Sequence, residues 1–140
     1  MTYLLDTHSL VWLLTDEGDI PLTVMEDISY YQNNYAVSEV TLYEIVQLQH
    51  KGSITLKQSP DELKKRLDSL NISILPVSDR ILNQFYDLPT PMIEGKRHSD
   101  PFDQIIIATA LVCRRRVVSA DHCFKWYRDN KRLDLLYYGR

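Results

Sequence analysis

Residues 101–121 read PFDQIIIATALVCRRRVVSAD, and this stretch decides the fold class. Proline at the first helical position and the dense apolar run after it predict a helix from Pro101 to Cys113. The pair Val117-Val118 predicts a short buried strand directly after that helix. A helix that leads at once into a buried strand is typical of α/β proteins, in which helices cover both faces of a parallel sheet.

The same alternation of strands and helices continues along the whole chain. Further strands are predicted at Thr2–Leu5, Tyr35–Val37, Ile72–Val77 and Leu135–Tyr138. Further helices, with their capping residues, are predicted at Ser9–Leu14, Pro21–Tyr31, Ser38–Gly52, Ser59–Ser69, Asp79–Leu88 and His122–Arg128. Right-handed crossovers between such strands give a three-layer α/β/α sandwich with a mostly parallel central sheet, here as a single domain over residues 1–140. The stretch Leu88–Asp100 is predicted to be the one long irregular loop.

Length and composition exclude several classes of protein. The chain has 140 residues, 44% apolar and 25% charged, which allows a hydrophobic core without disulfides or a structural metal. No apolar run approaches the ~18 residues of a membrane span, and the N-terminus has no basic signal-peptide region. Cys113 and Cys123 have neither zinc-site nor CxxC spacing, so free thiols in a reducing compartment are expected. We therefore expect a cytoplasmic protein that does not bind membranes.

The formal charge of −3 is distributed unevenly. Residues 1–50 carry eight acidic and no Lys or Arg side chains, whereas residues 114–140 carry eight Lys or Arg against three Asp. Each end is either solvated surface or part of a site, for a cation in the acidic third and for a polyanion in the basic segment. Candidates for contacts with phosphate groups are Lys125, Arg128, Lys131 and Arg132.

Four carboxylates are expected at one edge of the sheet. Asp6 ends the first strand, and Asp121 closely follows the strand at Val117-Val118. Glu44 and Asp103 lie within about two turns of the start of helices that are entered from the same edge. Ligands of open α/β sheets collect at this edge. A set of oxygen donors suits Mg²⁺ or Mn²⁺ far better than zinc or copper.

Helix capping is the alternative interpretation of the same acids. Asp6 and Asp121 precede helices, Thr41-x-x-Glu44 has the capping-box pattern, and Asp100-Pro101-Phe102-Asp103 places an N-cap acid before an N1 proline. Against capping alone, four acids at one edge would repel one another strongly without a cation.

Aromatic and histidine residues near these acids have mainly structural interpretations. Core positions are predicted for Trp12, Tyr43, Phe102 and Phe124, which stand at apolar helical positions. His8 and His98 lie near the proposed edge, where they either contact phosphate or serve as surface or hydrogen-bonded structural residues.

Four motifs follow one another along the chain in a fixed order. They are Leu4-Leu5-Asp6-Thr7-His8, Ser38-x-x-Thr41-x-Tyr43-Glu44-Ile45, His98-x-Asp100-Pro101-Phe102-Asp103 and Val118-Ser119-Ala120-Asp121. This succession, over residues 3–125, resembles that of PIN-domain ribonucleases. Within that family it is most similar to the VapC-type toxins of bacterial type II toxin–antitoxin pairs.

The resemblance implies a role for each matched residue. The family's acidic metal-binding positions correspond to Asp6, Glu44, Asp103 and Asp121, its small hydroxyl position to Ser119, and an extra acid of the subgroup to Asp100. The implied activity is that of an endoribonuclease that uses Mg²⁺ or Mn²⁺ to hydrolyse RNA phosphodiester bonds. The implied partners are an RNA substrate, a cognate antitoxin and a second copy in a homodimer.

Several positions depart from the subgroup's pattern. Tyr43, Leu48, Gln104 and Thr109 stand where the subgroup usually has Trp, Lys, Arg and Gln. Because all the acids are kept, these departures concern substrate contacts and antitoxin docking. Two other functions stay open: a non-catalytic PIN-like module that binds RNA or protein, and an aspartate-dependent phosphohydrolase. The phosphohydrolase would require a second Asp two residues after Asp6, and this sequence has His8 at that position.

Overall fold

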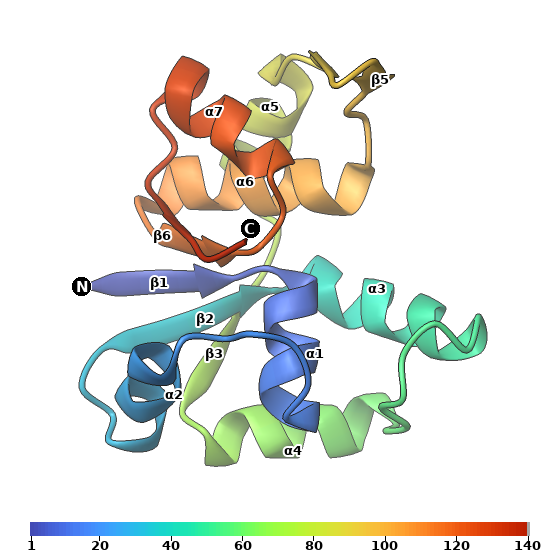
Figure 1. Cartoon of the computed structure of the whole chain (residues 1–140), viewed down its shortest axis with the longest axis vertical. Coiled ribbons are helices and arrows are strands. Elements are labelled where there is room, and N and C mark those ends of the chain that lie inside the picture. Colours follow the sequence, from blue (N-terminus) through green and yellow to red (C-terminus); the bar gives the residue numbers. More distant parts are fainter. Residues whose placement is uncertain (140) are drawn as a thin grey trace.

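A central sheet lies between two layers of helices in the computed structural model, which describes residues 1–139 (Figure 1). The strands of this sheet are β1 (Thr2–Leu5), β2 (Asn34–Ser38), β3 (Ile72–Leu75), β6 (Arg116–Ser119) and β7 (Leu135–Tyr137), and a separate pair is formed by β4 (Met92–Ile93) and β5 (Lys96–Arg97). The helices are α1 (Thr7–Thr15), α2 (Leu22–Ser29), α3 (Glu39–His50), α4 (Pro60–Ser69), α5 (Asp79–Asp87), α6 (Pro101–Cys113) and α7 (Cys123–Lys131). The predicted three-layer α/β/α class is confirmed.

The main sheet has the strand order β3-β2-β1-β6-β7, and every neighbouring pair is parallel. Strand β1 is central, with β2 on one side and β6 on the other. In register, Leu5 lies opposite Val118, so the residues that follow β1 and β6 leave the sheet side by side. The strand order reverses at β1, and such a reversal is where open α/β sheets form ligand sites.

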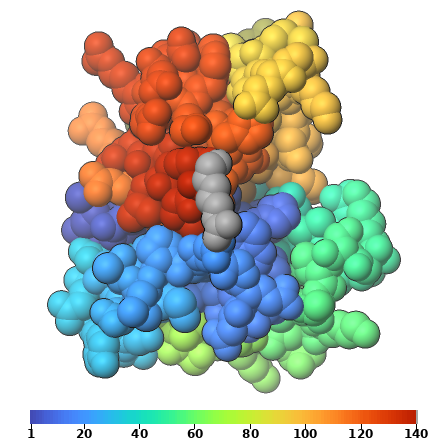
Figure 2. Space-filling view, viewed as in Figure 1, coloured from blue at the N-terminus to red at the C-terminus, as the bar shows by residue number. Residues whose placement is uncertain are grey.

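Alternation along each strand divides the core between the two faces of the sheet. Leu5, Val37 and Val118 pack with α1, α2 and α4, whereas their neighbours Leu4 and Val117 pack with α5, α6 and α7. Figure 2 shows how the chain follows this division: residues from the N-terminal half lie below and residues from the C-terminal half lie above. Among residues 1–139, no helix is both long and apolar enough to cross a membrane.

The prediction of an irregular loop over Leu88–Asp100 was wrong in part. Strands β4 and β5 form an antiparallel hairpin, with Ile93 paired to Lys96. Glu94 and Gly95 make its turn at φ values of 50° and 80°, which matches the twist that two-residue hairpins require. The paired strands are only two residues long and a glutamate occupies the first turn position, so the sequence carries a weak hairpin signal.

Candidate functional site

Asp6 is held at the carboxyl end of β1 by contacts on both of its oxygens. Its Oδ1 accepts a hydrogen bond from the Ser9 amide at 2.9 Å and so caps α1. Its Oδ2 accepts from the Ser119 hydroxyl at 2.5 Å, across the β1–β6 pair. Asp6 is 4% exposed, and burial raises the pKa of its carboxyl, with a smaller contribution from the charge of Asp103. The residue is therefore a fixed, desolvated oxygen donor.

Glu44 enters the same region from α3, which follows β2. Helix α3 is capped by Ser38, whose hydroxyl accepts from the Val40 amide, so the capping-box interpretation of Glu44 was wrong. Glu44 is buried in the second turn, and its Oε1 has no hydrogen-bond partner within residues 1–139. Burial raises the pKa of this carboxyl, and the charge of Asp103 raises it further. An unpaired buried carboxylate oxygen is costly unless a cation or a donor satisfies it.

Asp103 lies in the first turn of α6, against a buried histidine. Nε2 of His98 is 3.3 Å from Asp103 Oδ2, and Nδ1 of His98 is 2.8 Å from the Tyr127 hydroxyl. The Gln104 side chain donates to the backbone oxygen of His98 at 3.1 Å. Burial raises the pKa of Asp103, as do the charges of Asp100 and Asp121, while the His98 hydrogen bond lowers it. His98 is thus a hydrogen-bonded structural residue that orients Asp103.

Electrostatic coupling links the four predicted acids, with Asp103 at the centre. Its charge acts on Asp6 and Glu44, and the charge of Asp121 acts on it. Within residues 1–139, however, no three of these acids bring ligand oxygens within 4.8 Å of one another. The acids therefore share one region of negative potential, without forming a closed ligand shell.

The family follows from comparison with known proteins. Residues 3–129 match the model of the PIN domain. This chain belongs to the PIN-domain family. No curated protein matches it.

Solved structures share the fold of this PIN domain over nearly its whole length. VapBC2 from Rickettsia felis, bound to a DNA fragment from its promoter, is 19% identical with a TM-score of 0.67, over 98% of both chains. VapBC-1 from nontypeable Haemophilus influenzae is 17% identical with a TM-score of 0.66, also over 98% of both chains. A toxin–antitoxin complex from Klebsiella pneumoniae is 20% identical with a TM-score of 0.60, over 99% of both chains. At these identities the likeness concerns the fold.

The acids of this PIN domain fit the divalent metal that the family implies. The donors at the carboxyl edge are carboxylate oxygens, as Mg²⁺ and Mn²⁺ prefer. The strongest indication of a metal site is the buried Glu44 Oε1 atom, which has no hydrogen-bond partner among the described residues. A cation at this edge would also offset the mutual repulsion of Asp6, Glu44 and Asp103, whose pKa values are all raised.

Two further acids accept hydrogen bonds from backbone amides where helices start, but only Asp100 is an N-cap, because the N-cap of α7 is His122. Asp100 is exposed, and its Oδ1 accepts from the amides of Phe102 and Asp103 at 2.9 and 3.2 Å. Asp121 Oδ1 accepts from the Cys123 amide at 2.9 Å at the start of α7. The Ser119 hydroxyl, which donates to Asp6, also accepts from the Asp121 amide at 3.0 Å. Ser119 therefore connects two of the candidate metal ligands.

The basic candidates are spread along α7. The Lys125 ammonium lies 4.6 Å from the centre of the Tyr137 ring, and Arg128 pairs with Asp129 at 3.0 Å. Lys131 and Arg132 are exposed at the far end of α7, about 12 Å along the helix axis from its start. Of these four basic residues, Lys125 is the one that lies nearest in sequence to Asp121.

The aromatic and remaining histidine residues divide into buried and exposed groups. Phe124 is fully buried, and Trp12 and Phe102 are half-buried. The core prediction for Tyr43 was wrong, because 67% of this residue is exposed. It borders a surface groove between α3 and α4 instead of facing the sheet. His8 is exposed.

Proposed function

We propose that this PIN domain is a metal-dependent endoribonuclease and the toxin component of a toxin–antitoxin pair. The observation that carries the proposal is the set of buried, electrostatically coupled carboxylates at the switch point of the sheet, with Glu44 Oε1 unpaired among the described residues. Buried ionisable side chains with shifted pKa values are concentrated at functional sites of proteins. PIN domains are typically nucleases, which supports hydrolysis of a phosphodiester bond.

The candidate residues would have two roles in such a reaction, which are binding the metal ions and positioning the metal ligands. Asp6, Glu44, Asp103 and Asp121 would hold one or two Mg²⁺ or Mn²⁺ ions. When bound, such ions lower the pKa of a water molecule and neutralise charge on the leaving oxygen. Ser119 keeps Asp6 in place through its 2.5 Å hydrogen bond. His98 does the same for Asp103, and Asp100 fixes the first turn of α6.

Substrate binding requires positive charge outside the carboxylate cluster. Lys125, Arg128, Lys131 and Arg132 follow Asp121 on one helix and its end. Contacts between these side chains and phosphates would give salt-dependent affinity that varies little with sequence. We expect RNA as the substrate and the cytoplasm as the place of action.

An antitoxin and a second copy of the chain are the proposed protein partners. The similar solved structures include toxin–antitoxin complexes. An antitoxin segment that inserts an Arg or Lys among the carboxylates would neutralise them and block the site. Exposed Leu22, Tyr30 and Tyr31, each at least 60% exposed, supply apolar surface for a homodimer. A monomer by light scattering at micromolar concentration would exclude the homodimer.

The decisive test is cleavage of structured RNA by the purified full chain. Cleavage should require Mn²⁺ or Mg²⁺ and stop in EDTA. Asp6→Asn and Asp103→Asn should each abolish it while the circular dichroism spectrum stays native. The matched control is Asp68→Asn, which removes an exposed acid of α4 and should leave the rate unchanged.

Other outcomes would select one of the alternatives. Full activity in Asp6→Asn or Asp103→Asn, or activity that survives EDTA, would refute the site. RNA binding without cleavage would indicate a non-catalytic module. Hydrolysis of small phosphate esters through a phosphorylated Asp6 would favour the phosphohydrolase.

A further inference from the structure

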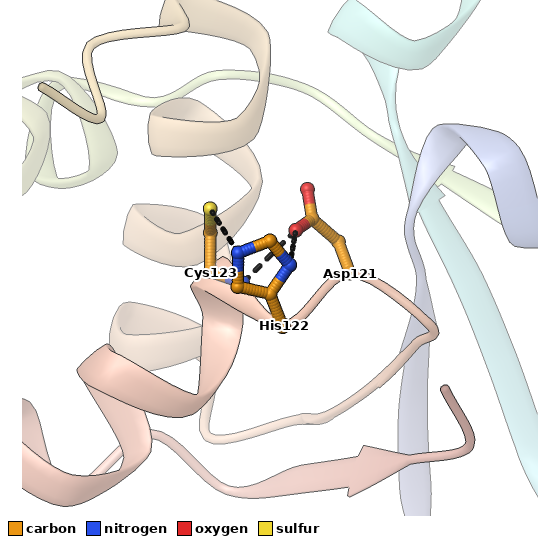
Figure 3. Close-up of side chains that lie close together, drawn as sticks. All are labelled: Asp121, His122 and Cys123. Carbon is orange, nitrogen blue, oxygen red and sulfur yellow. Dashed lines mark hydrogen bonds and ion pairs between the residues drawn. The ribbon is translucent and has the colours of Figure 1, made fainter. Parts of the chain in front are cut away.

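A second cluster of ligand-type side chains lies beside the acids, where β6 leads into α7. Asp121, His122 and Cys123 each offer one ligand atom, and these atoms all lie within 4.8 Å of one another. Figure 3 shows the His122 ring between the Asp121 carboxylate and the Cys123 sulfur. The three residues are consecutive, so the turn that begins α7 is itself the scaffold of the cluster.

A fourth donor reaches this cluster from the β4–β5 hairpin. His122 Nε2 lies 3.2 Å from Glu94 Oε2 and 3.9 Å from Cys123 Sγ, so one ring nitrogen faces both. The other ring nitrogen, Nδ1, lies 3.8 Å from Asp121 Oδ1. Glu94, His122 and Cys123 line a surface cavity of about 310 Å³, which leaves room for an ion to enter. The hairpin and α7 thus present donors to a common space.

The donors here differ in chemical kind from those of the carboxylate cluster. A thiolate and an imidazole favour zinc-class ions, whereas carboxylates alone favour Mg²⁺ and Mn²⁺. In a tetrahedral zinc site, bond lengths of about 2.3 Å to sulfur and 2.0 Å to nitrogen place these two ligand atoms roughly 3.6 Å apart. The observed distance between Cys123 Sγ and His122 Nε2 is 3.9 Å. The sulfur and nitrogen atoms of this pair therefore lie close to the separation that a shared ion requires.

We propose that Cys123, His122, Asp121 and Glu94 form a binding site for a zinc-class divalent ion, which shares Asp121 with the carboxylate cluster and differs from it in the nitrogen and sulfur donors. Binding would displace the thiol proton of Cys123 to solvent and tie the β4–β5 hairpin to the start of α7. The thiolate and two carboxylates would carry three negative charges against the two positive charges of the ion. The remaining single negative charge would be balanced by either Lys96 or Arg97, which line the same cavity.

Co²⁺ absorption of the full chain tests this site without reference to RNA cleavage. Metal-free protein is titrated with Co²⁺ in excess Mg²⁺, which saturates oxygen-only sites. Wild type should develop a near-ultraviolet thiolate-to-cobalt charge-transfer band and the strong visible bands of four-coordinate cobalt, and Zn²⁺ should remove both. Cys123→Ser should lose the charge-transfer band. Cys113→Ser is the matched control, because Cys113 is an exposed free thiol at the C-terminal end of α6, outside the proposed site, and this variant should keep the band.

A separate variant tests whether Glu94 is the fourth ligand. Glu94→Gln removes one exposed carboxylate from the hairpin turn and should weaken Co²⁺ binding by about tenfold or more while keeping the band. Absence of the band in wild type, its survival in Cys123→Ser, or its loss in Cys113→Ser would overturn the site. Unchanged affinity in Glu94→Gln would overturn the four-donor arrangement. Native circular dichroism of each variant ensures that these results report on metal binding, whether or not the chain cleaves RNA.

Discussion

Replacing Asp6 by Asn should stabilise the metal-free protein at neutral pH. The Asp6 carboxylate is 4% exposed and lies in the field of Asp103. Asparagine is as good an N-cap as aspartate, so the hydrogen bond from the Ser9 amide is kept. The substitution therefore removes a buried charge without removing the cap of α1.

The size of the effect follows from two opposing contributions. Burying a carboxylate costs several kcal/mol, and each hydrogen bond to the charged form returns about 1.5–3 kcal/mol. The raised pKa of Asp6 indicates that burial outweighs its hydrogen bonds from Ser9 and Ser119. In the Asn variant the side-chain oxygen still accepts from the Ser9 amide, while the side-chain amide group takes the place of Oδ2 and donates to the Ser119 hydroxyl oxygen. These neutral hydrogen bonds contribute about 0.5–1.5 kcal/mol each, and the buried charge is gone. We expect a net gain on the order of 1 kcal/mol, or about 3 °C in Tm for a chain of this size.

The gain should depend on pH in a definite direction. Below the unfolded-state pKa of 3.8, Asp6 is protonated in both states and wild type carries no penalty. As the pH rises through the higher folded-state pKa, wild type loses stability and the Asn variant does not. The difference in Tm should therefore open between about pH 4 and neutral pH.

Thermal melts with EDTA and with Mn²⁺ check the argument. Metal at about 100 times Kd adds roughly 2.7 kcal/mol to a protein that binds it, so Mn²⁺ should stabilise wild type more than the Asn variant. A lower Tm for the variant in EDTA at neutral pH, or equal stabilisation of both proteins by Mn²⁺, would refute the proposed buried metal ligand.

Three further predictions concern neighbouring residues. Asp100→Ala should lower stability by about 1 kcal/mol and Asp100→Asn by a few tenths, equally with and without metal, because Asp100 is an exposed cap; melts of both variants in EDTA and in Mn²⁺ check this. Ser119→Ala should cost about 1–3 kcal/mol by urea denaturation, since Asp6 Oδ2 loses its donor. Lys125→Ala should reduce the salt dependence of RNA affinity by about 0.7 in log–log slope for a lost phosphate contact, unlike the control Lys64→Ala; an unchanged slope would remove Lys125 from the RNA interface.

The fold was predictable because its strongest signals are local. The buried pairs Leu4-Leu5 and Val117-Val118 each place one side chain on either face of the sheet, which only a layer of helices on both faces can cover. The capping box at Ser59 and the N1 proline of α6 fixed helix starts correctly. The position of Asp6 at the carboxyl end of β1 followed from the same alternation.

Contacts between distant residues were not predictable in this way. His98 and Tyr127 are hydrogen-bonded across 29 positions of the chain, and neither periodicity nor a capping pattern relates them. Tyr43 occupies a position that an amphipathic pattern assigns to the core, yet the groove beside α4 leaves it exposed. Both cases depend on how elements pack together, which a single sequence does not specify.

Capping and metal binding were opposed as interpretations of the acids, but the topology makes them compatible. A residue that ends a parallel strand and begins the next helix stands at the carboxyl edge of the sheet, where ligands bind. Asp6 caps α1 through Oδ1 and accepts from Ser119 through Oδ2, and each oxygen keeps a second lone pair. Asp100 makes the same kind of cap but is exposed. Burial at the carboxyl edge, beyond the cap itself, is therefore what distinguishes Asp6 as a candidate metal ligand from a residue that only begins a helix.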